Sequence, residues 1–159
     1  MTEKPPPARP AAIRTFVGVA LLALIAFVIV LVATRSESEP GAGEISADSY
    51  AVEVAAALAN ADSEIGGDLV YELECNLCHL RGDGSQSPLF YGLADIAAER
   101  RPPLSAEQYL YEATLYPGLH LVEGYSNSMP NNYQDRLSQQ DVGHIIAYLL
   151  GFTAGVTDP

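Results

Sequence analysis

The sequence has few of the side chains that most metal and disulfide sites require. Its 159 residues contain two cysteines, three histidines, two methionines and no tryptophan. A structural zinc site usually takes four Cys or His ligands. A second Cys-x-x-Cys pair is missing, and His120 and His144 do not have ligand spacing, so the sequence argues against a zinc domain.

Strand patterns are also missing, and no segment of the sequence repeats another. The sequence therefore predicts an all-α fold. A thioredoxin-like disulfide site needs a Cys-x-x-Cys pair at the start of a helix within a βαβ unit. Here the pair follows a predicted helix, and no sheet is predicted, so this redox chemistry is disfavoured as well.

Basic residues become scarce after the first part of the chain. From Arg35 onward nineteen Asp and Glu face five Arg, a net charge of −14 with neutral histidines. A surface of this charge repels polyanions. Nucleic acids and anionic lipid headgroups are therefore not expected as partners of this region.

One long apolar run stands apart from this acidic region. Phe16–Ala33 holds eighteen residues without a charge, and Thr15 and Thr34 extend it to twenty. A helix of that length spans about 30 Å, one hydrocarbon thickness. A signal peptide would have an apolar core of about 7–15 residues and a small-x-small cleavage site. The sequence favours an uncleaved transmembrane helix over 15–34, rather than a cleaved signal or a buried core helix.

The flanking charges predict the orientation of this helix. Lys4, Arg9 and Arg14 precede it, which places the N-terminal end in the cytoplasm. Everything after Arg35 should then lie on the outer, periplasmic side of a bacterial cytoplasmic membrane. The expected organisation is a cytoplasmic leader at 1–14, a transmembrane helix at 15–34, a linker with a short helix at 35–62, and a folded domain at 63–159.

Four further helices are expected beyond the linker's start. The alanine-rich stretch 50–60, capped by Asp48 or Ser49, is too short to be stable alone. It must pack on its own domain or on a partner protein. The other three run from about Ser63 to the cysteines, over 105–116 from Ser105, and from Ser138 to about residue 152. Gly66 and Gly67 lie inside the helix that begins near Ser63, and they require close packing there.

Residues 75–79 read CNLCH and contain both cysteines of the chain. Cys-x-x-Cys-His is the attachment signature of a c-type haem. Cys75 and Cys78 would form thioether bonds to the two vinyl groups, and His79 would be the proximal ligand of the iron. This attachment is made outside the cytoplasmic membrane, where the predicted topology places the motif.

The second axial ligand is predicted to be Met129, fifty residues after His79 in the polar stretch SNSMPNN. A methionine that only fills a core usually lies in an apolar segment. His120, between two leucines, is a competitor. His144 lies about 200° around the last helix from Val142, which predicts a solvated surface position.

These motifs resemble a class I, mitochondrial-type, single-haem cytochrome c domain over residues 63–152. GGDLVYELECNLCH is similar to the family's first helix, and DVGHIIAYLL to its closing helix. The resemblance implies a cytochrome c fold in which Ile145, Tyr148 and Leu149 meet Gly67. SPLF is similar to a turn whose proline carbonyl accepts a hydrogen bond from the proximal imidazole, which implies this role for Pro88. SMP matches the methionine loop.

The sequence departs from the family pattern at three places. Leu80 follows the histidine where the family often has glycine, and Ser87 precedes Pro88 in place of a glycine. No tryptophan can serve as the aromatic residue near a haem propionate. Tyr125 and Tyr133 are both candidates for that position.

The resemblance implies a membrane-anchored electron carrier rather than an enzyme, with one covalent haem c and a His/Met-ligated iron. A catalytic or gas-binding haem protein with an open axial site is the alternative. The expected partners are the membrane, redox proteins and other subunits of a respiratory or photosynthetic complex. Among such subunits, the mono-haem cytochrome subunit of bacterial alternative complex III is the first candidate that the resemblance suggests. Helix 50–60 shows no evident partner in the chain, which favours a docked subunit over a tethered shuttle.

Overall fold

The computed structural model of the chain describes residues 20–29, 45–81 and 83–156. The chain divides into two compact units, Met1–Gly43 and Glu44–Pro159. In the first unit residues 20–29 are helical. None of the helices in the described ranges has both the length and the apolarity needed to cross a membrane. The rest of the predicted transmembrane segment 15–34, and the whole leader 1–14, lie outside the described residues.

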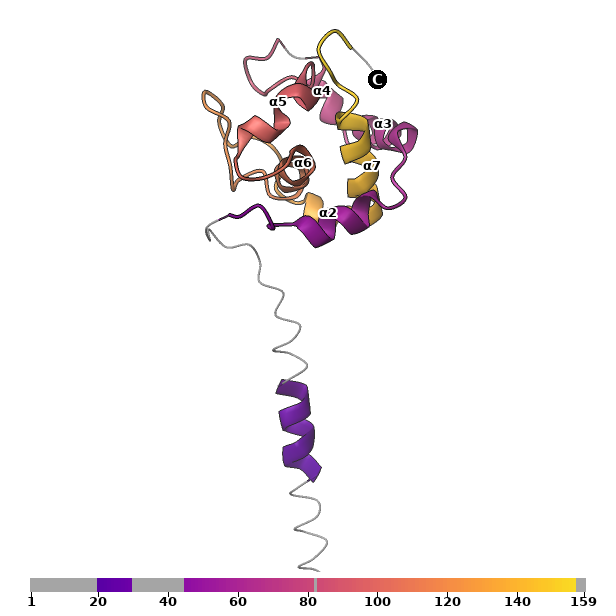
Figure 1. The fold of residues 1–159 in the computed structure, drawn as a ribbon, viewed down its shortest axis with the longest axis vertical. Helices are drawn as coiled ribbons and strands as arrows, with labels where there is room; N and C mark the ends of the chain where they lie inside the picture. The colour runs from indigo at the N-terminus through magenta and orange to yellow at the C-terminus, as the bar shows by residue number, and fades with distance from the viewer. Residues whose placement is uncertain (1–19, 30–44, 82, 157–159) are drawn as a thin grey trace, which may run out of the picture. The chain divides into compact units, whose positions relative to one another are not determined.

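The second unit confirms the all-α fold class, since its described residues contain helices and no strand. In Figure 1, α3 and α7 lie together on one side and α5 and α6 on the other. The elements are α2 (Ala51–Leu58), α3 (Ser63–Glu72), α4 (Cys75–His79), α5 (Leu93–Arg100), α6 (Ala106–Leu115), a 3-10 helix (Tyr133–Asp135) and α7 (Gln139–Leu149).

The crossing of α3 and α7 depends on glycine. A Cβ atom built on Gly66 would overlap the carbonyl oxygen of His144, so the two helix backbones touch there. A Cβ on Gly67 would meet only the ring of Tyr148, at 3.1 Å. The expected close packing at these glycines is confirmed, but Gly66 makes the tightest contact, whereas the resemblance assigned the contact to Gly67.

Helix α2 packs on α7 within the same unit. Val54 and Ala57 are buried, and a Cβ on Gly143 would overlap the carbonyl oxygen of Ala57. The interpretation that this helix lacks a partner in the chain is therefore wrong. The expected boundary between linker and domain after residue 62 falls inside the compact unit.

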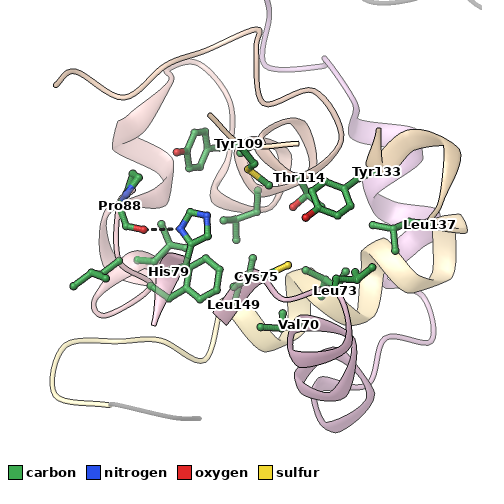
Figure 2. A pocket seen from close by; sticks show the side chains of 17 residues that line it. Val70, Leu73, Cys75, His79, Pro88, Tyr109, Thr114, Tyr133, Leu137 and Leu149 are labelled. Carbon is green, nitrogen blue, oxygen red and sulfur yellow. Dashed lines mark hydrogen bonds between the residues drawn. The ribbon is translucent and has the colours of Figure 1, made fainter. Parts of the chain in front are cut away.

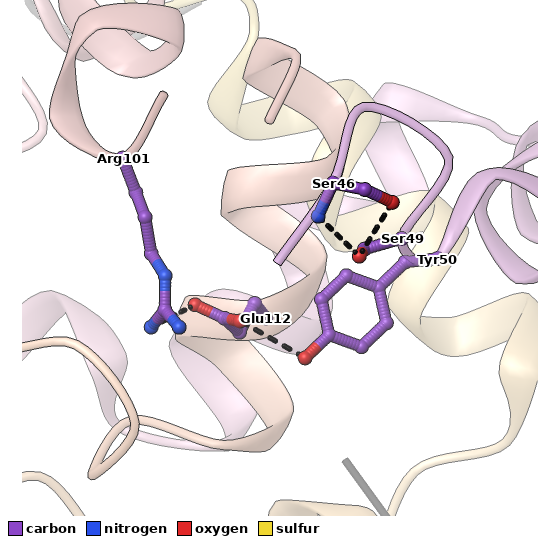
Figure 3. Close-up of polar contacts among 5 residues, drawn as sticks. All are labelled: Ser46, Ser49, Tyr50, Arg101 and Glu112. Carbon is purple, nitrogen blue, oxygen red and sulfur yellow. Dashed lines mark hydrogen bonds and ion pairs between the residues drawn. The ribbon is translucent and has the colours of Figure 1, made fainter. Parts of the chain in front are cut away.

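The predicted N-caps of α2 are also wrong. The cap position is Tyr50, in a left-handed conformation with φ 62° and no side-chain cap. Its ring is directed toward α6, and its hydroxyl donates to Glu112 Oε2 at 2.9 Å (Figure 3). Glu112 is 1 % exposed and forms an ion pair with Arg101 at 2.7 Å. Burial and the adjacent carboxylate raise the pKa of Tyr50. This cluster ties the start of α2 to α6.

His144 is buried, in contrast to the solvated position that the sequence predicted. It is 8 % exposed, and its Nδ1 accepts a hydrogen bond from the backbone N–H of Asp62 at 2.8 Å. The prediction assumed that α7 buries one face. The helix instead contacts α2, α3 and α6, so its sides are covered as well. Asp62, rather than Ser63, caps α3.

Two predicted caps are confirmed, and α5 lies where no helix was predicted. Ser105 and Ser138 each form a capping box at the start of α6 and α7. Helix α5 begins after Gly92, which has φ 73° and no side chain that could cap it. Its buried residues, Leu93 and Ala97, are spaced by one helical turn.

Candidate cofactor site

The Cys-x-x-Cys-His motif occupies its own short helix. Helix α3 ends at Glu72 instead of running into the cysteines, and the chain turns through Leu73 and Glu74. Glu74 has φ 61°, a left-handed conformation that is uncommon outside glycine. This turn separates α4 from α3, and two side chains of α4, Cys75 and His79, line an apolar pocket.

The pocket is enclosed by most elements of the unit. It holds about 670 Å³ of space free of protein atoms, a volume that includes the solvent at its open mouth. Its surface is mainly apolar, as Figure 2 shows. The lining residues come from α3 and α4 and the turns after them (Val70, Leu73, Cys75, His79, Pro88, Leu89, Phe90), from α5 and α6 (Leu93, Tyr109, Leu110, Ala113, Thr114), and from the last third of the chain (Met129, Tyr133, Leu137, Ile145, Leu149).

His79 points into this pocket with one ring nitrogen already bonded. Its Nδ1 lies 2.6 Å from the carbonyl oxygen of Pro88 (Figure 2), so the hydrogen bond expected between these residues is present. Phe90 stacks on the imidazole at 4.6 Å between ring centroids. Burial lowers the pKa of His79, and the bond to Pro88 opposes that effect. A neutral imidazole that donates from Nδ1 keeps the Nε2 lone pair free for a metal.

The two cysteines differ in their surroundings. Cys75 is half-buried and lines the pocket, whereas Cys78 is exposed and lies outside the lining. Burial raises the pKa of the Cys75 thiol, and the hydroxyl of Tyr133 acts against this by a hydrogen bond. Cys78 lies three residues after Cys75 on α4, a little less than one helical turn.

Met129 reaches the same pocket from a loop fifty residues beyond His79. It is half-buried and packs against the core, between exposed neighbours. His120, the competing ligand candidate, is not among the lining residues. Its ring contacts Tyr109 edge-to-face at 6.3 Å. The structure therefore brings Cys75, His79, Pro88 and Met129 together, and leaves His120 and His144 outside.

The structure distinguishes Tyr125 from Tyr133, the two candidates for the aromatic position. Tyr133 is buried, lines the pocket and hydrogen-bonds Cys75, with the guanidinium of Arg136 5.5 Å above its ring. Tyr125 is absent from the lining and donates instead to the carbonyl of Gly84.

Sequence reasoning missed the pocket wall that α6 provides. Tyr109, Leu110, Ala113 and Thr114 line the pocket from that helix. Their spacing of one, four and five residues marks one helix face. This spacing could have predicted from the sequence that one face of α6 is turned to the interior.

The donor set restricts what the pocket can hold. Among the residues that the structure describes, no group of three or more His, Cys, Asp or Glu gathers to hold a metal ion. The pocket offers one imidazole (His79), one thioether (Met129) and one thiol (Cys75), which do not complete the four protein ligands of a structural metal site. These residues fit an iron whose other ligands arrive with it in a macrocycle. The apolar walls fit the rings of such a group.

Comparison with models of protein families, with curated proteins and with solved structures gave no significant match.

Proposed function

We propose that this domain has the cytochrome c fold, binds one haem covalently and carries single electrons. One observation carries the proposal: Cys75, His79 and Met129, from α4 and a loop far along the chain, line a single apolar pocket. Each has the donor atom that its proposed role requires. The chance occurrence of a Cys-x-x-Cys-His motif would not place a distant methionine in the same pocket.

Each residue would have a defined part in holding the group. Cys75 and Cys78 would form the thioether bonds, and His79 would offer Nε2 while Nδ1 donates to Pro88. Met129 would provide the second axial ligand. A haem bound in this way would supply one-electron redox chemistry. The methionine sulfur, as a ligand of the iron, would favour the reduced state.

The pocket walls would tune that chemistry by excluding water. Val70, Ile145 and Leu149 are 0–5 % exposed and face the pocket from α3 and α7. A shell of this kind controls solvent access and local dielectric, and so the potential of a bound metal centre. With both axial positions occupied by side chains, oxygen or a substrate would find no open site, which disfavours the catalytic and gas-binding alternative.

The wider setting of the domain follows from the sequence. The apolar run 15–34 would anchor the chain in a bacterial cytoplasmic membrane, with the acidic domain on the periplasmic side. The domain would then exchange electrons with redox partner proteins, as a subunit of a respiratory or photosynthetic complex or as a tethered shuttle. The packing of α2 on α7 removes the reason that favoured docking.

Substitution of Met129 tests the axial assignment. In protein produced in cells that attach haem c, Met129→Ala should remove the weak near-infrared band of methionine–Fe(III) coordination. It should also lower the reduction potential and open the iron to carbon monoxide. His120→Ala is the matched control and should leave all three properties unchanged. If His120→Ala changes the spectrum while Met129→Ala retains it, the assignment is wrong.

A further inference from the structure

The loop that carries Met129 is held by few bonds of its own. Residues 117–132 contain turns and bends but no helix. Its internal backbone hydrogen bonds are short-range, such as Tyr125 N–H to Val122 O at 3.1 Å and Ser128 N–H to Ser126 O at 2.9 Å. Segments with only local bonds open easily. The position of Met129 therefore depends on contacts outside the loop.

Tyr125 makes such a contact four residues before Met129. Its hydroxyl donates to the carbonyl oxygen of Gly84 at 2.9 Å, across 41 residues of sequence and in a partly buried position. Gly84 has φ 79°, which directs its backbone in a way that other residues adopt with strain. Leu89, a pocket residue, lies 3.6 Å from the Cβ position of this glycine. The acceptor thus lies next to a side chain that lines the pocket.

The turn that Tyr125 reaches also holds His79. Pro88 accepts the hydrogen bond from His79 Nδ1, and the N–H of Phe90 donates to the His79 carbonyl at 3.0 Å. Residues 84–90 therefore contact His79 directly. They also contact the loop that carries Met129, through the hydroxyl of Tyr125.

We propose that Tyr125 is a positioning residue that holds the Met129 loop against the 84–90 turn and so limits displacement of Met129 by external ligands. The inference rests on the proposed function, because it requires Met129 to be an axial ligand. Without the hydroxyl the loop loses its tie while the aromatic ring still packs. An external ligand then competes with a methionine that is held less firmly.

Imidazole binding to the oxidised, haem-loaded protein measures this effect. In Tyr125→Phe the dissociation constant for imidazole should fall about fivefold, within the roughly two- to thirteenfold range that one net hydrogen bond represents. The methionine band should persist without imidazole. Hydrogen exchange gives a second readout, and should accelerate in residues 117–132 but not in α7.

Tyr91→Phe is the matched control. The Tyr91 hydroxyl also donates to a backbone carbonyl, that of Leu80 at 3.1 Å, but this bond does not involve the Met129 loop. Its removal should leave imidazole affinity unchanged. Equal affinities of wild type and Tyr125→Phe, or equal shifts in both variants, would overturn the role of Tyr125 alone. A wild-type protein without the methionine band would instead overturn the axial assignment on which the role depends.

Discussion

Single polar side chains decide where the long helices of this domain begin. At α7 the N–H of Asp141 donates to the hydroxyl oxygen of Ser138 at 3.2 Å. The Asp141 carboxylate accepts from the Ser138 N–H at 2.9 Å and from the Ser138 hydroxyl at 2.7 Å. These bonds favour the charged carboxylate, so they lower the pKa of Asp141 from its usual 3.8. Both partners of this box are visible in the sequence.

Ser138→Ala should lower the free energy of unfolding by about 1 kcal/mol at neutral pH. The depressed pKa of Asp141 means that the folded state binds fewer protons than the unfolded state. Its stabilising effect is therefore complete above pH 3.8 and is lost as the pH falls through the folded pKa. The variant should lose less stability than wild type on acidification in this range. Denaturant titration at neutral and acidic pH checks this, with Ser126→Ala in an exposed loop as control.

At the scale of elements, the contact of α3 with α7 is sensitive to added volume. Gly66→Ala should cost about 3 kcal/mol or more, because its methyl group would meet the backbone of His144 rather than a movable side chain. Gly67→Ala should cost about 1 kcal/mol, since the Tyr148 ring can shift by a few tenths of an ångström. Thermal or denaturant unfolding measures both. Equal losses would mean that the backbone contact at Gly66 is not decisive.

The elements differ in how far the sequence predicted them. Helices α6 and α7 were predicted because a serine cap marks the start of each, and apolar spacing also marks α7. Helix α5 was missed because it starts at Gly92 with no side-chain cap. The break between α3 and α4 depends on a left-handed Glu74, a conformation that glutamate does not signal.

The pocket shows the same division. Cys75, His79 and Met129 were singled out in the sequence because the proposed covalent and axial chemistry demands particular residue types, and the structure places all three on the lining. The burial of His144 was not predicted, because it follows from the covering of α7 by several helices, which one helix's periodicity does not reveal.

Helix α2 could have been placed on its own domain from one further signal. Gly143 lies in the interior of α7, where glycine usually reflects close backbone approach, and α2 is the element that approaches. The amides of 51–58 should therefore exchange slowly with solvent in the isolated protein. Gly143→Ala should displace α2 and accelerate exchange there, while α5 stays protected. Fast exchange throughout 51–58 in the wild-type protein would contradict this packing.

At the scale of the whole molecule, charge should govern encounters with redox partners. Nineteen acidic residues against five arginines follow residue 34. If the domain carries electrons, small cationic oxidants should react with its reduced form faster than anionic oxidants of similar potential at low salt. The ratio of rates should approach one near 1 M salt, where the Debye length is about 3 Å. Stopped-flow mixing measures both rates, and a ratio independent of salt would refute electrostatic steering.

The covalent attachment of haem at Cys75 and Cys78 is the central claim, and mass spectrometry of the purified full chain tests it most directly. After acid–acetone extraction the polypeptide should keep its colour, its mass should exceed the sequence mass by one haem, and the peptide containing residues 75–79 should carry the addition. Cys75→Ala and Cys78→Ala should each remove one thioether bond. A colourless polypeptide of unmodified mass with two free thiols, from cells that attach haem to other proteins, would contradict the account.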